Sequence, residues 1–250
     1  MGLIVLAAGL GTRVSSISGN VPKFLLRVEG RPLLYYPIAV ASSIGISDVC
    51  VIAPKGWSSQ ALAIARDLVG PGADAVENPY PERENGFSLY LGLSCMGWYG
   101  DFLVSMTDHL YTGFMLIRIS HSLRSGSYSY IVGGDRWAEY VDHDEATRIS
   151  VWDPMTISRC GKNVDPYIYI DVGVQAVRAE KLELILGRGE EAWSKPLSEV
   201  VNSVAVLGEA GVADVTGLLW TEIDTPRDFE EVSRGRRRRV LEKVLEWLRS

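Results

Sequence analysis

The stretch Leu6-Ala7-Ala8-Gly9-Leu10-Gly11-Thr12-Arg13, followed by Pro22-Lys23, decides the fold of this chain. It begins at the end of a continuous apolar run, residues 2–7, which is typical of a strand buried on both faces of a parallel sheet. Glycines directly after such a strand let backbone N–H groups approach a phosphate without an intervening side chain. Thr12 adds a hydroxyl, and Arg13 and Lys23 add two cations that can neutralise phosphate charge. The stretch therefore predicts a phosphate-binding loop, with a simple strand-to-helix turn as the alternative.

Two common phosphate-binding loops do not match this stretch. A Walker loop requires G-x-x-x-x-G-K-[ST], which the chain lacks. A dinucleotide fingerprint requires a third glycine after Gly9 and Gly11, and Val14 occupies that position. The loop therefore belongs to neither of these classes.

Strand-like and helix-like segments alternate after the loop. The pattern predicts a helix over 32–44, a strand over 48–53, a helix over 58–69 and a strand over 102–106. Such alternation is typical of an α/β protein with a doubly wound, mainly parallel sheet.

The middle of the chain has a different texture. Four strand-like segments are separated by turn residues rather than by helices, at 128–133, 139–141, 147–151 and 167–177. They predict a smaller β-rich lobe over about 128–177. Further along, the pattern predicts helices over 182–186 and 197–206, a last strand over 218–223, and helix from Pro226 onward. We expect one domain over 1–230 and a basic amphipathic helix over 231–250.

Composition excludes several classes of protein. The 250 residues include 25 Lys and Arg against 31 Asp and Glu, a net charge of −6, and 47% are hydrophobic. This balance is that of a globular protein, and it argues against a general nucleic-acid binder, which needs a basic face. No run approaches the ~18 apolar residues of a membrane helix, and no basic leader is present, so we expect a soluble protein.

The three cysteines, Cys50, Cys95 and Cys160, are odd in number and far apart. This spacing predicts three buried thiols rather than a zinc site or a disulfide framework. Free thiols in turn favour a cytoplasmic location.

Two acids follow predicted strands. Asp108 follows the strand over 102–106, and Asp224 follows the strand over 218–223. In open α/β sheets ligands bind beyond the carboxyl ends of the strands, where these carboxylates could hold Mg²⁺. Helix capping is the alternative for each, and it is physically attractive for Asp224, which stands before Thr225-Pro226.

The string LAAGLGTR…PK resembles the signature of the nucleotidyltransferases that activate sugar phosphates and related phosphates. The resemblance implies a Rossmann-like fold of the nucleotide-diphospho-sugar transferase type, with the β-rich lobe binding the acceptor. It implies catalytic roles for Arg13 and Lys23, and Mg²⁺ held by Asp108 and Asp224, with Glu222 as a third or replacement ligand. The loop residues that would hold the triphosphate are Leu6, Ala7, Ala8, Gly9, Gly11 and Thr12. Residues 14–21 depart from the Pro-x-Thr of many sugar-nucleotide members.

Residues 78–89, together with Thr107-Asp108-His109, are similar to the cytidylyltransferase branch, in particular to archaeal CTP:inositol-1-phosphate cytidylyltransferases. This resemblance implies CTP as the nucleotide, with Asn85 and Ser88 near the cytidine; an N-cap role is the alternative for both. His109 has no partner that the sequence identifies. The resemblance also implies inositol 1-phosphate as the acceptor. Its candidate ligands are Asp135, Glu145, Lys162 and Asp171, which combine a cation with hydrogen-bond acceptors.

The C-terminal segment 234–249 is rich in arginine and carries an apolar stripe that includes Val240, Leu241 and Val244. It predicts either a packed helix or a surface helix that contacts anionic lipid or a membrane CDP-alcohol phosphotransferase. Members of the branch can be fused to such a phosphotransferase. Because this chain ends at Ser250, we expect that partner to be separate.

Together with these observations, the resemblance implies a Mg²⁺-dependent cytidylyltransferase that forms CDP-inositol and pyrophosphate from CTP and inositol 1-phosphate. One alternative is a nucleotidyltransferase for phosphocholine or a sugar 1-phosphate. Two others are a catalytically silent nucleotide-sensing subunit, and a membrane-tethering adaptor built on the basic tail.

Overall fold

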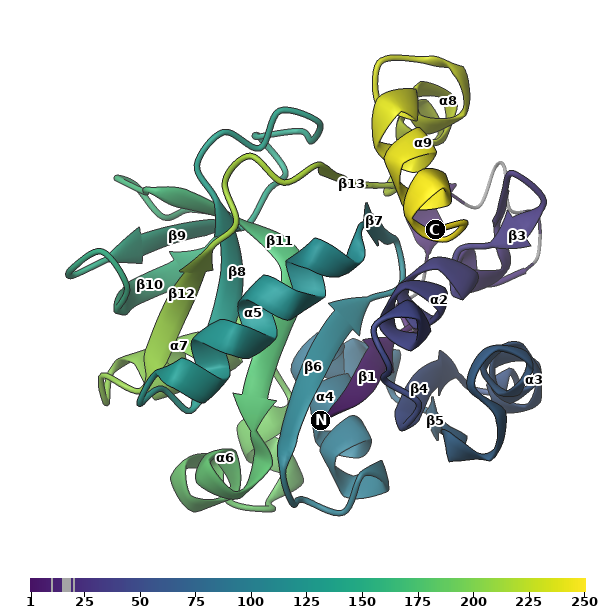
Figure 1. Cartoon of the computed structure of the whole chain (residues 1–250). Helices are drawn as coiled ribbons and strands as arrows, with labels where there is room; N and C mark the ends of the chain where they lie inside the picture. Colours follow the sequence, from purple (N-terminus) through teal and green to yellow (C-terminus); the bar gives the residue numbers. More distant parts are fainter. Residues whose placement is uncertain (10, 15–18, 20) are drawn as a thin grey trace.

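Strand β1 lies inside a nine-stranded sheet in the computed structural model, which describes residues 1–9, 11–14, 19 and 21–250 (Figure 1). The sheet runs in the order β10-β9-β11-β6-β1-β4-β5, with β8 paired to β11 and β12 paired to β8. β1 is parallel to both β4 and β6, as the buried run after Met1 predicts. The strands are β1 (Gly2–Leu6), β4 (Val49–Pro54), β5 (Ala73–Asn78), β6 (Asp101–Met106), β8 (Tyr130–Asp135), β9 (Arg148–Val151), β10 (Ile157–Gly161), β11 (Tyr169–Arg178) and β12 (Ala210–Asp214).

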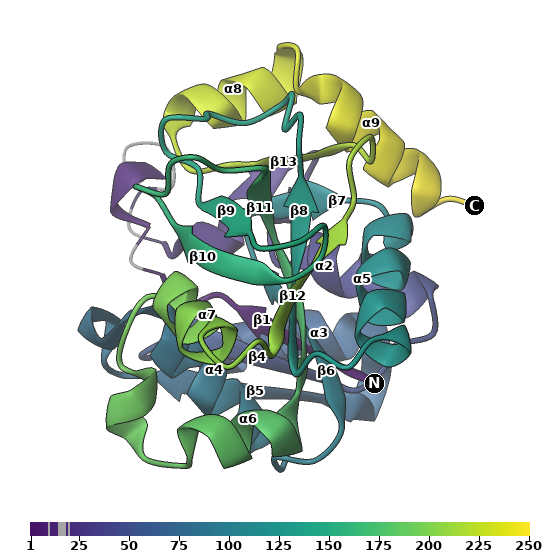
Figure 2. The ribbon, with the colours of Figure 1, turned by 90° about the vertical axis from the view of Figure 1, so that its left-hand side faces the viewer.

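Helices cover both faces of this sheet (Figures 1 and 2). Because side chains alternate along a strand, Leu3 and Val5 of β1 join one buried cluster, and Ile4 and Leu6 join the other. The first cluster includes residues of α2 (Tyr35–Ser43), α3 (Ser58–Val69), α5 (Gly113–Ser125) and α9 (Arg238–Trp247). The second includes residues of α4 (Glu84–Cys95), α6 (Ala179–Leu186) and α7 (Leu197–Ala205). The expected doubly wound sheet is confirmed.

Shorter elements complete the described chain. Two small ladders pair β2 (Arg27–Val28) with β3 (Arg31–Pro32), and β7 (His109–Tyr111) with β13 (Trp220–Glu222). The remaining helix is α8 (Pro226–Arg234). Short 3₁₀ turns occur at Thr12–Val14, Lys23–Leu25, Gly70–Gly72, Pro81–Arg83 and Glu190–Trp193.

The β-rich middle of the chain is continuous with the central sheet. β11 runs antiparallel to β8 along one edge, and along its other edge it pairs antiparallel with β9 near its start and with β6 near its end, so it joins the two halves. The expected strand over 139–141 is wrong. That segment is a loop, and the Tyr140 carbonyl accepts a hydrogen bond from Thr221 Oγ1 at 2.7 Å instead of joining a ladder.

The C-terminal helix packs against the body of the protein. Val240, Leu241 and Val244 are fully buried in the same cluster as β1, and the Trp247 indole donates to Ser43 Oγ at 2.7 Å. Of the two expected alternatives, the structure shows the packed helix, because protein already covers the apolar stripe. Among the described residues, no helix combines the length and the apolar character needed to span a bilayer.

The cysteines also differ from expectation. Cys50 of β4 and Cys95 at the end of α4 form a disulfide, with their Cα atoms 6.6 Å apart, and Cys160 is a buried free thiol. The two partners are 45 residues apart in sequence, and only the packing of α4 on β4 brings them together. The expectation of three free thiols was wrong. The argument for a cytoplasmic location depended on those thiols, so it no longer holds.

Candidate active site

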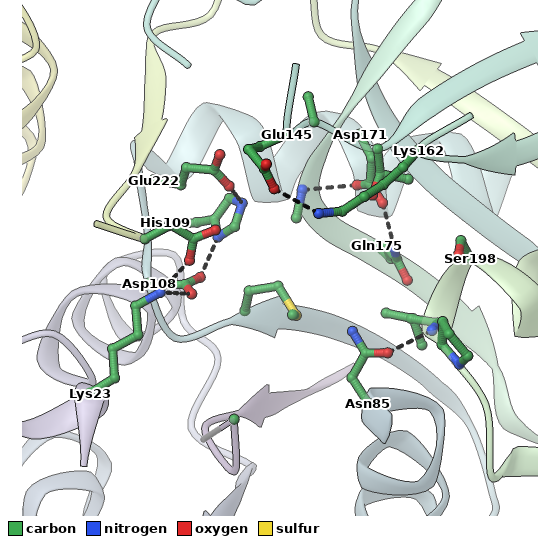
Figure 3. A pocket seen from close by; sticks show the side chains of 18 of the residues that line it. Lys23, Asn85, Asp108, His109, Glu145, Lys162, Asp171, Gln175, Ser198 and Glu222 are labelled. Carbon is green, nitrogen blue, oxygen red and sulfur yellow. Dashed lines mark hydrogen bonds and ion pairs between the residues drawn. The ribbon is translucent and has the colours of Figure 1, made fainter. Parts of the chain in front are cut away.

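A cavity of about 600 Å³ opens at the carboxyl ends of β1 and β6 (Figure 3). The chain passes from β1 to β4 and β5 on one side, then returns to β6 on the other side of β1. The loops after β1 and β6 therefore diverge at a topological switch point, where open α/β sheets bind ligands. The cavity collects many of the residues that the sequence identifies: Gly9, Gly11, Arg13, Lys23, Asn85, Asp108, Glu145, Lys162, Asp171, Glu222 and Asp224.

Lys23 joins the two predicted metal-binding acids. Its ammonium group lies 2.5 Å from Asp108 Oδ2 and also contacts Asp224 Oδ1. Burial tends to lower the pKa of Lys23, but the two carboxylates outweigh it and raise that pKa, so Lys23 stays cationic. Gly11 allows this approach, because its φ is +58° and an added Cβ would stand 3.0 Å from the Lys23 Cβ.

Asp108 has a second cationic partner that the sequence left unidentified. Its Oδ1 lies 2.6 Å from His109 Nδ1, while His109 Nε2 lies 3.4 Å from Glu222 Oε2. Burial alone would raise the pKa of Asp108, but Lys23 and His109 hold it well below its usual range. Burial likewise opposes protonation of His109, yet Asp108 outweighs it and raises the pKa of the imidazole to about 9. The pair is therefore a carboxylate and an imidazolium at neutral pH.

Two neighbours hold the His109 ring. It stacks on Trp220 at 5.9 Å between centroids, with 5° between the planes, because β7 pairs with β13. Gly173, with φ +67°, lies so close that an added Cβ would overlap the ring. Trp220 Nε1 in turn donates to Asp135 Oδ2 at 2.8 Å. Asp135 is 4% exposed and also accepts from the Trp137 N–H, which corrects its expected acceptor-binding role: it positions Trp220.

The donor set suits a hard divalent cation. Asp108 and Asp224 contact one ammonium group, so their carboxylates are close enough to share one cation. Within the described part of the chain, no three His, Cys, Asp or Glu side chains converge on a single metal position. Mg²⁺ is commonly bound through one or two carboxylates, and substrate phosphates and water complete its shell. The two carboxylates therefore fit a hard divalent cation whose remaining ligands come from outside the protein.

Glu222 is placed differently from Asp224. Its carboxylate points toward His109 (Figure 3). Asp224 instead contacts both Lys23 and, at 3.0 Å, Arg13 Nη2. Burial raises the pKa of Glu222 to about 7, because the nearby charge of His109 offsets only part of that effect. The geometry therefore favours Asp224 over Glu222 as the second metal ligand.

An exposed ion-pair chain crosses the mouth of the cavity. Glu145 Oε2 lies 3.5 Å from Arg13 Nη1 and 2.9 Å from Lys162 Nζ. All three side chains are more than half exposed, so the pairs contribute little stability and can exchange for phosphate. Arg13 and Lys162 thus share Glu145 Oε2 and are both accessible to an anionic ligand.

The side of the cavity that was predicted to bind the acceptor is polar. Asp171 accepts from the Gly173 N–H at 2.9 Å and from Gln175 Nε2 at 3.1 Å, and burial raises its pKa to about 6. Sequence reasoning missed Gln175, and also Thr147 and Ser198, which line the same cavity. The two-residue period of the predicted strand 167–177 was the available signal for Gln175, since it places this side chain on the Asp171 face.

The nucleotide side receives one of the two predicted polar residues. Asn85 lines the cavity, and its Oδ1 accepts from the Leu197 N–H at 2.6 Å, which ties α4 to the start of α7. Ser88 is 4% exposed and accepts from Asn78 Nδ2 at 3.0 Å, which corrects its expected nucleotide contact. Leu6, Ala7 and Ala8 are buried, so only their backbone can serve the loop. Leu10 and the Thr12 side chain lie outside what the structure describes.

Comparison with known proteins shows the family. The model of the MobA-like NTP transferase domain matches residues 3–148, more than half of the chain. A bifunctional IPC transferase and DIPP synthase of Aquifex aeolicus is 29% identical over 231 residues, which are 92% of this chain and 50% of that relative. The protein of the same name from Thermococcus kodakarensis is 33% identical over 239 residues, 94% of this chain and 49% of the relative.

A solved structure agrees with these matches over nearly the whole chain. The inositol-1-phosphate CTP transferase from T. maritima superposes with a TM-score of 0.85 at 25% identity, covering 98% of this chain and 96% of that one. The chain spans about half the length of the two bifunctional relatives. From the matched domain and the shared fold, the chain belongs to the MobA-like NTP transferase family.

Proposed function

We propose that this chain is a Mg²⁺-dependent cytidylyltransferase that joins CTP and inositol 1-phosphate to give CDP-inositol and pyrophosphate. The observation that carries the proposal is the buried cluster of Lys23, Asp108 and Asp224 beside the glycine loop at the switch point. The likeness to an inositol-1-phosphate CTP transferase supports the choice of both substrates.

The reaction needs positioning and charge neutralisation more than proton transfer. An oxygen of the acceptor phosphate forms a bond to the α-phosphorus of CTP, while the bond from that phosphorus to the β-phosphate oxygen breaks. The electron pair leaves on pyrophosphate, and the attacking phosphate is already anionic, so no general base is required. Lys23 and Arg13 neutralise the charge that develops on the leaving pyrophosphate. Mg²⁺ bound to Asp108 and Asp224 would supply further charge neutralisation at the phosphates.

The other side of the cavity binds the acceptor. Lys162 offers a cation for the acceptor phosphate after it leaves Glu145. Asp171, Gln175 and Thr147 offer hydrogen-bond acceptors and donors for the ring hydroxyls of inositol. An acceptor rich in hydroxyls suits this polar wall better than phosphocholine, whose trimethylammonium group is usually recognised by aromatic side chains.

Pyrophosphate release tests the proposal. We would combine CTP, UTP, dTTP, ATP and GTP with inositol 1-phosphate, phosphocholine and glucose 1-phosphate, each with Mg²⁺. We expect one strong signal, for CTP with inositol 1-phosphate. A strong signal for another pair would keep the nucleotidyl transfer but replace the substrate. Binding of CTP without pyrophosphate release from any pair would instead indicate a nucleotide-sensing subunit.

A further inference from the structure

One arginine of the basic C-terminal run is directed into the protein, unlike its neighbours. Arg237 and its partner Asp228 are 14% and 11% exposed, and Arg237 Nη1 lies 2.6 Å from Asp228 Oδ1. Arg236 pairs with Glu139 and Arg238 pairs with Glu29, and the side chains of those pairs are 33% exposed or more. An arginine placed only for solubility or lipid contact would not be buried in this way.

Arg237 and Asp228 lead directly to Asp224. The same Arg237 Nη1 donates to the Glu222 carbonyl at 3.3 Å, at the end of β13. Asp228 Oδ2 accepts from the Asp224 N–H at 3.1 Å and from the Thr225 N–H and hydroxyl, both at 2.8 Å. The backbone on both sides of the Asp224 side chain is thus tied to one buried ion pair.

Asp224 needs this support because several charged groups attract or repel its carboxylate at once. Its carboxylate contacts Lys23 and Arg13, and it shares Lys23 with the like-charged Asp108. A metal ion and a nucleotide would compete for Lys23, Arg13 and the two carboxylates. The hydrogen bonds to the Asp224 backbone would then hold its carboxylate in place. Hydrogen bonds of this outer kind orient metal ligands, and their loss typically lowers metal affinity about 10–100-fold.

We propose that Arg237, acting through Asp228, is a positioning residue that holds Asp224 in place to bind the divalent cation. The inference rests on the proposed use of Asp224 as a metal ligand. It gives the start of the C-terminal helix a role in the active site, since α9 begins at the residue after Arg237.

Metal binding without turnover tests this role. We would titrate the full chain with Mn²⁺ alone, following free Mn²⁺ by electron paramagnetic resonance, for the wild type and Arg237→Met. We would also measure CTP affinity by calorimetry without acceptor, in Mg²⁺ and in EDTA. We expect Arg237→Met to weaken Mn²⁺ binding at least tenfold and to lose the gain in CTP affinity that Mg²⁺ provides. CTP affinity in EDTA should stay within twofold of the wild type.

Three further variants separate positioning from simple loss of stability. Arg236→Met removes an exposed arginine of the same run and should bind Mn²⁺ as the wild type does. Val244→Ala loosens the buried face of α9 without touching the ion pair, and it too should keep Mn²⁺ affinity. Arg237→Lys keeps the positive charge and replaces Arg237→Met in the titration if that variant fails to fold. We expect Arg237→Lys to lose less Mn²⁺ affinity than Arg237→Met.

Three results overturn the inference: wild-type Mn²⁺ affinity in both Arg237 variants, an equal loss of Mn²⁺ affinity in Val244→Ala, or a wild-type chain that binds no Mn²⁺. Failure of the proposed function is distinguishable, because a wild type that does not bind CTP would refute that function while the Mn²⁺ titration still decides the role of Arg237.

Discussion

The two sides of the cavity, one proposed for the nucleotide and the other for the acceptor, are built in different ways. On the nucleotide side, the Lys23 and Asp108 side chains are only 11% and 15% exposed. They lie beyond the ends of a parallel sheet whose two faces are both buried. On the acceptor side, Glu145 and Lys162 are 55% and 56% exposed and belong to the antiparallel part of the chain or its loops. One side holds its charges in place by burial and mutual pairing, while the other holds charges that solvent and ligand can reach.

This difference separates the chemistry from the choice of acceptor. Buried charges cost free energy unless they are paired, so the Lys23 cluster stays assembled without a ligand. Exposed ion pairs contribute about 0–1 kcal/mol to the free energy of unfolding. Charged residues on the acceptor side can therefore be substituted with little loss of stability. We therefore expect variants of the nucleotide side to affect reaction rate and stability, and variants of the acceptor side to affect substrate affinity.

The largest effect should come from Asp108→Asn, which keeps the shape but removes the charge that Lys23 and His109 share. We expect pyrophosphate release from CTP and inositol 1-phosphate to fall by about 10²–10³-fold, the usual cost of removing one electrostatic group. Asp101→Asn, at the start of the same strand, removes a carboxylate 4.0 Å from Arg178 and should leave the rate unchanged. A rate for Asp108→Asn within tenfold of the wild type would contradict the claim that the charges of the nucleotide side control the reaction rate.

We expect the second-largest effect from removing the disulfide, which tests whether this link stabilises the nucleotide side. Replacing both Cys50 and Cys95 by Ala removes a link across 45 residues, so we expect a loss of about 2–4 kcal/mol in the free energy of unfolding in urea. The rate of pyrophosphate release at 25 °C should not change. Reducing agent should destabilise the wild type but not the double variant. Equal stability of the oxidised wild type and the double variant would count against the link.

His109 tests the buried electrostatics by their pH dependence. Its pKa is about 9 in the folded protein and 6.5 ordinarily, so its charge stabilises the fold fully below pH 6.5 and progressively less up to about pH 9. At about 1.4 kcal/mol per pH unit this contribution is about 3 kcal/mol at pH 6. Urea unfolding in EDTA should therefore show that His109→Asn is most damaging at pH 6 and loses that excess cost by pH 10.

The control for this titration is His121→Asn, which replaces an exposed histidine on α5. Its stability should differ from that of the wild type by a constant amount across the same pH range. A constant difference for His109→Asn as well would show that the ring matters only through its packing on Trp220.

The smallest effect should come from Lys162→Ala on the acceptor side. We expect the KM for inositol 1-phosphate to rise about tenfold, or about 1.4 kcal/mol, with kcat and the affinity for CTP little changed. Lys181→Ala, an exposed lysine on α6, is the matched control. If kcat falls while KM stays constant, Lys162 acts in the chemical step, and the two sides are not separated as the structure indicates.

Much of the nucleotide side could be predicted from the sequence. The run before Gly9 identified a buried strand, the helix over 58–69 has the expected bounds, and Asp108 and Asp224 both reach the cavity. These features follow from local patterns, because apolar periodicity sets the element and the end of a parallel strand sets the edge of the sheet. The acceptor side was predicted less completely: Glu145, Lys162 and Asp171 line the cavity, but Asp135 does not lie among its lining residues.

What the sequence by itself determined is the alternation of strands and helices in the first part of the chain and the identity of the charged groups around the glycine loop. The tertiary structure decided which distant groups meet: Cys50 with Cys95, His109 with Glu222, and Arg237 with Asp228. Residues that are distant in sequence meet only when helices and strands pack. A cysteine, a histidine or one arginine among several carries no local pattern that names its partner, because burial and distance belong to the assembled fold.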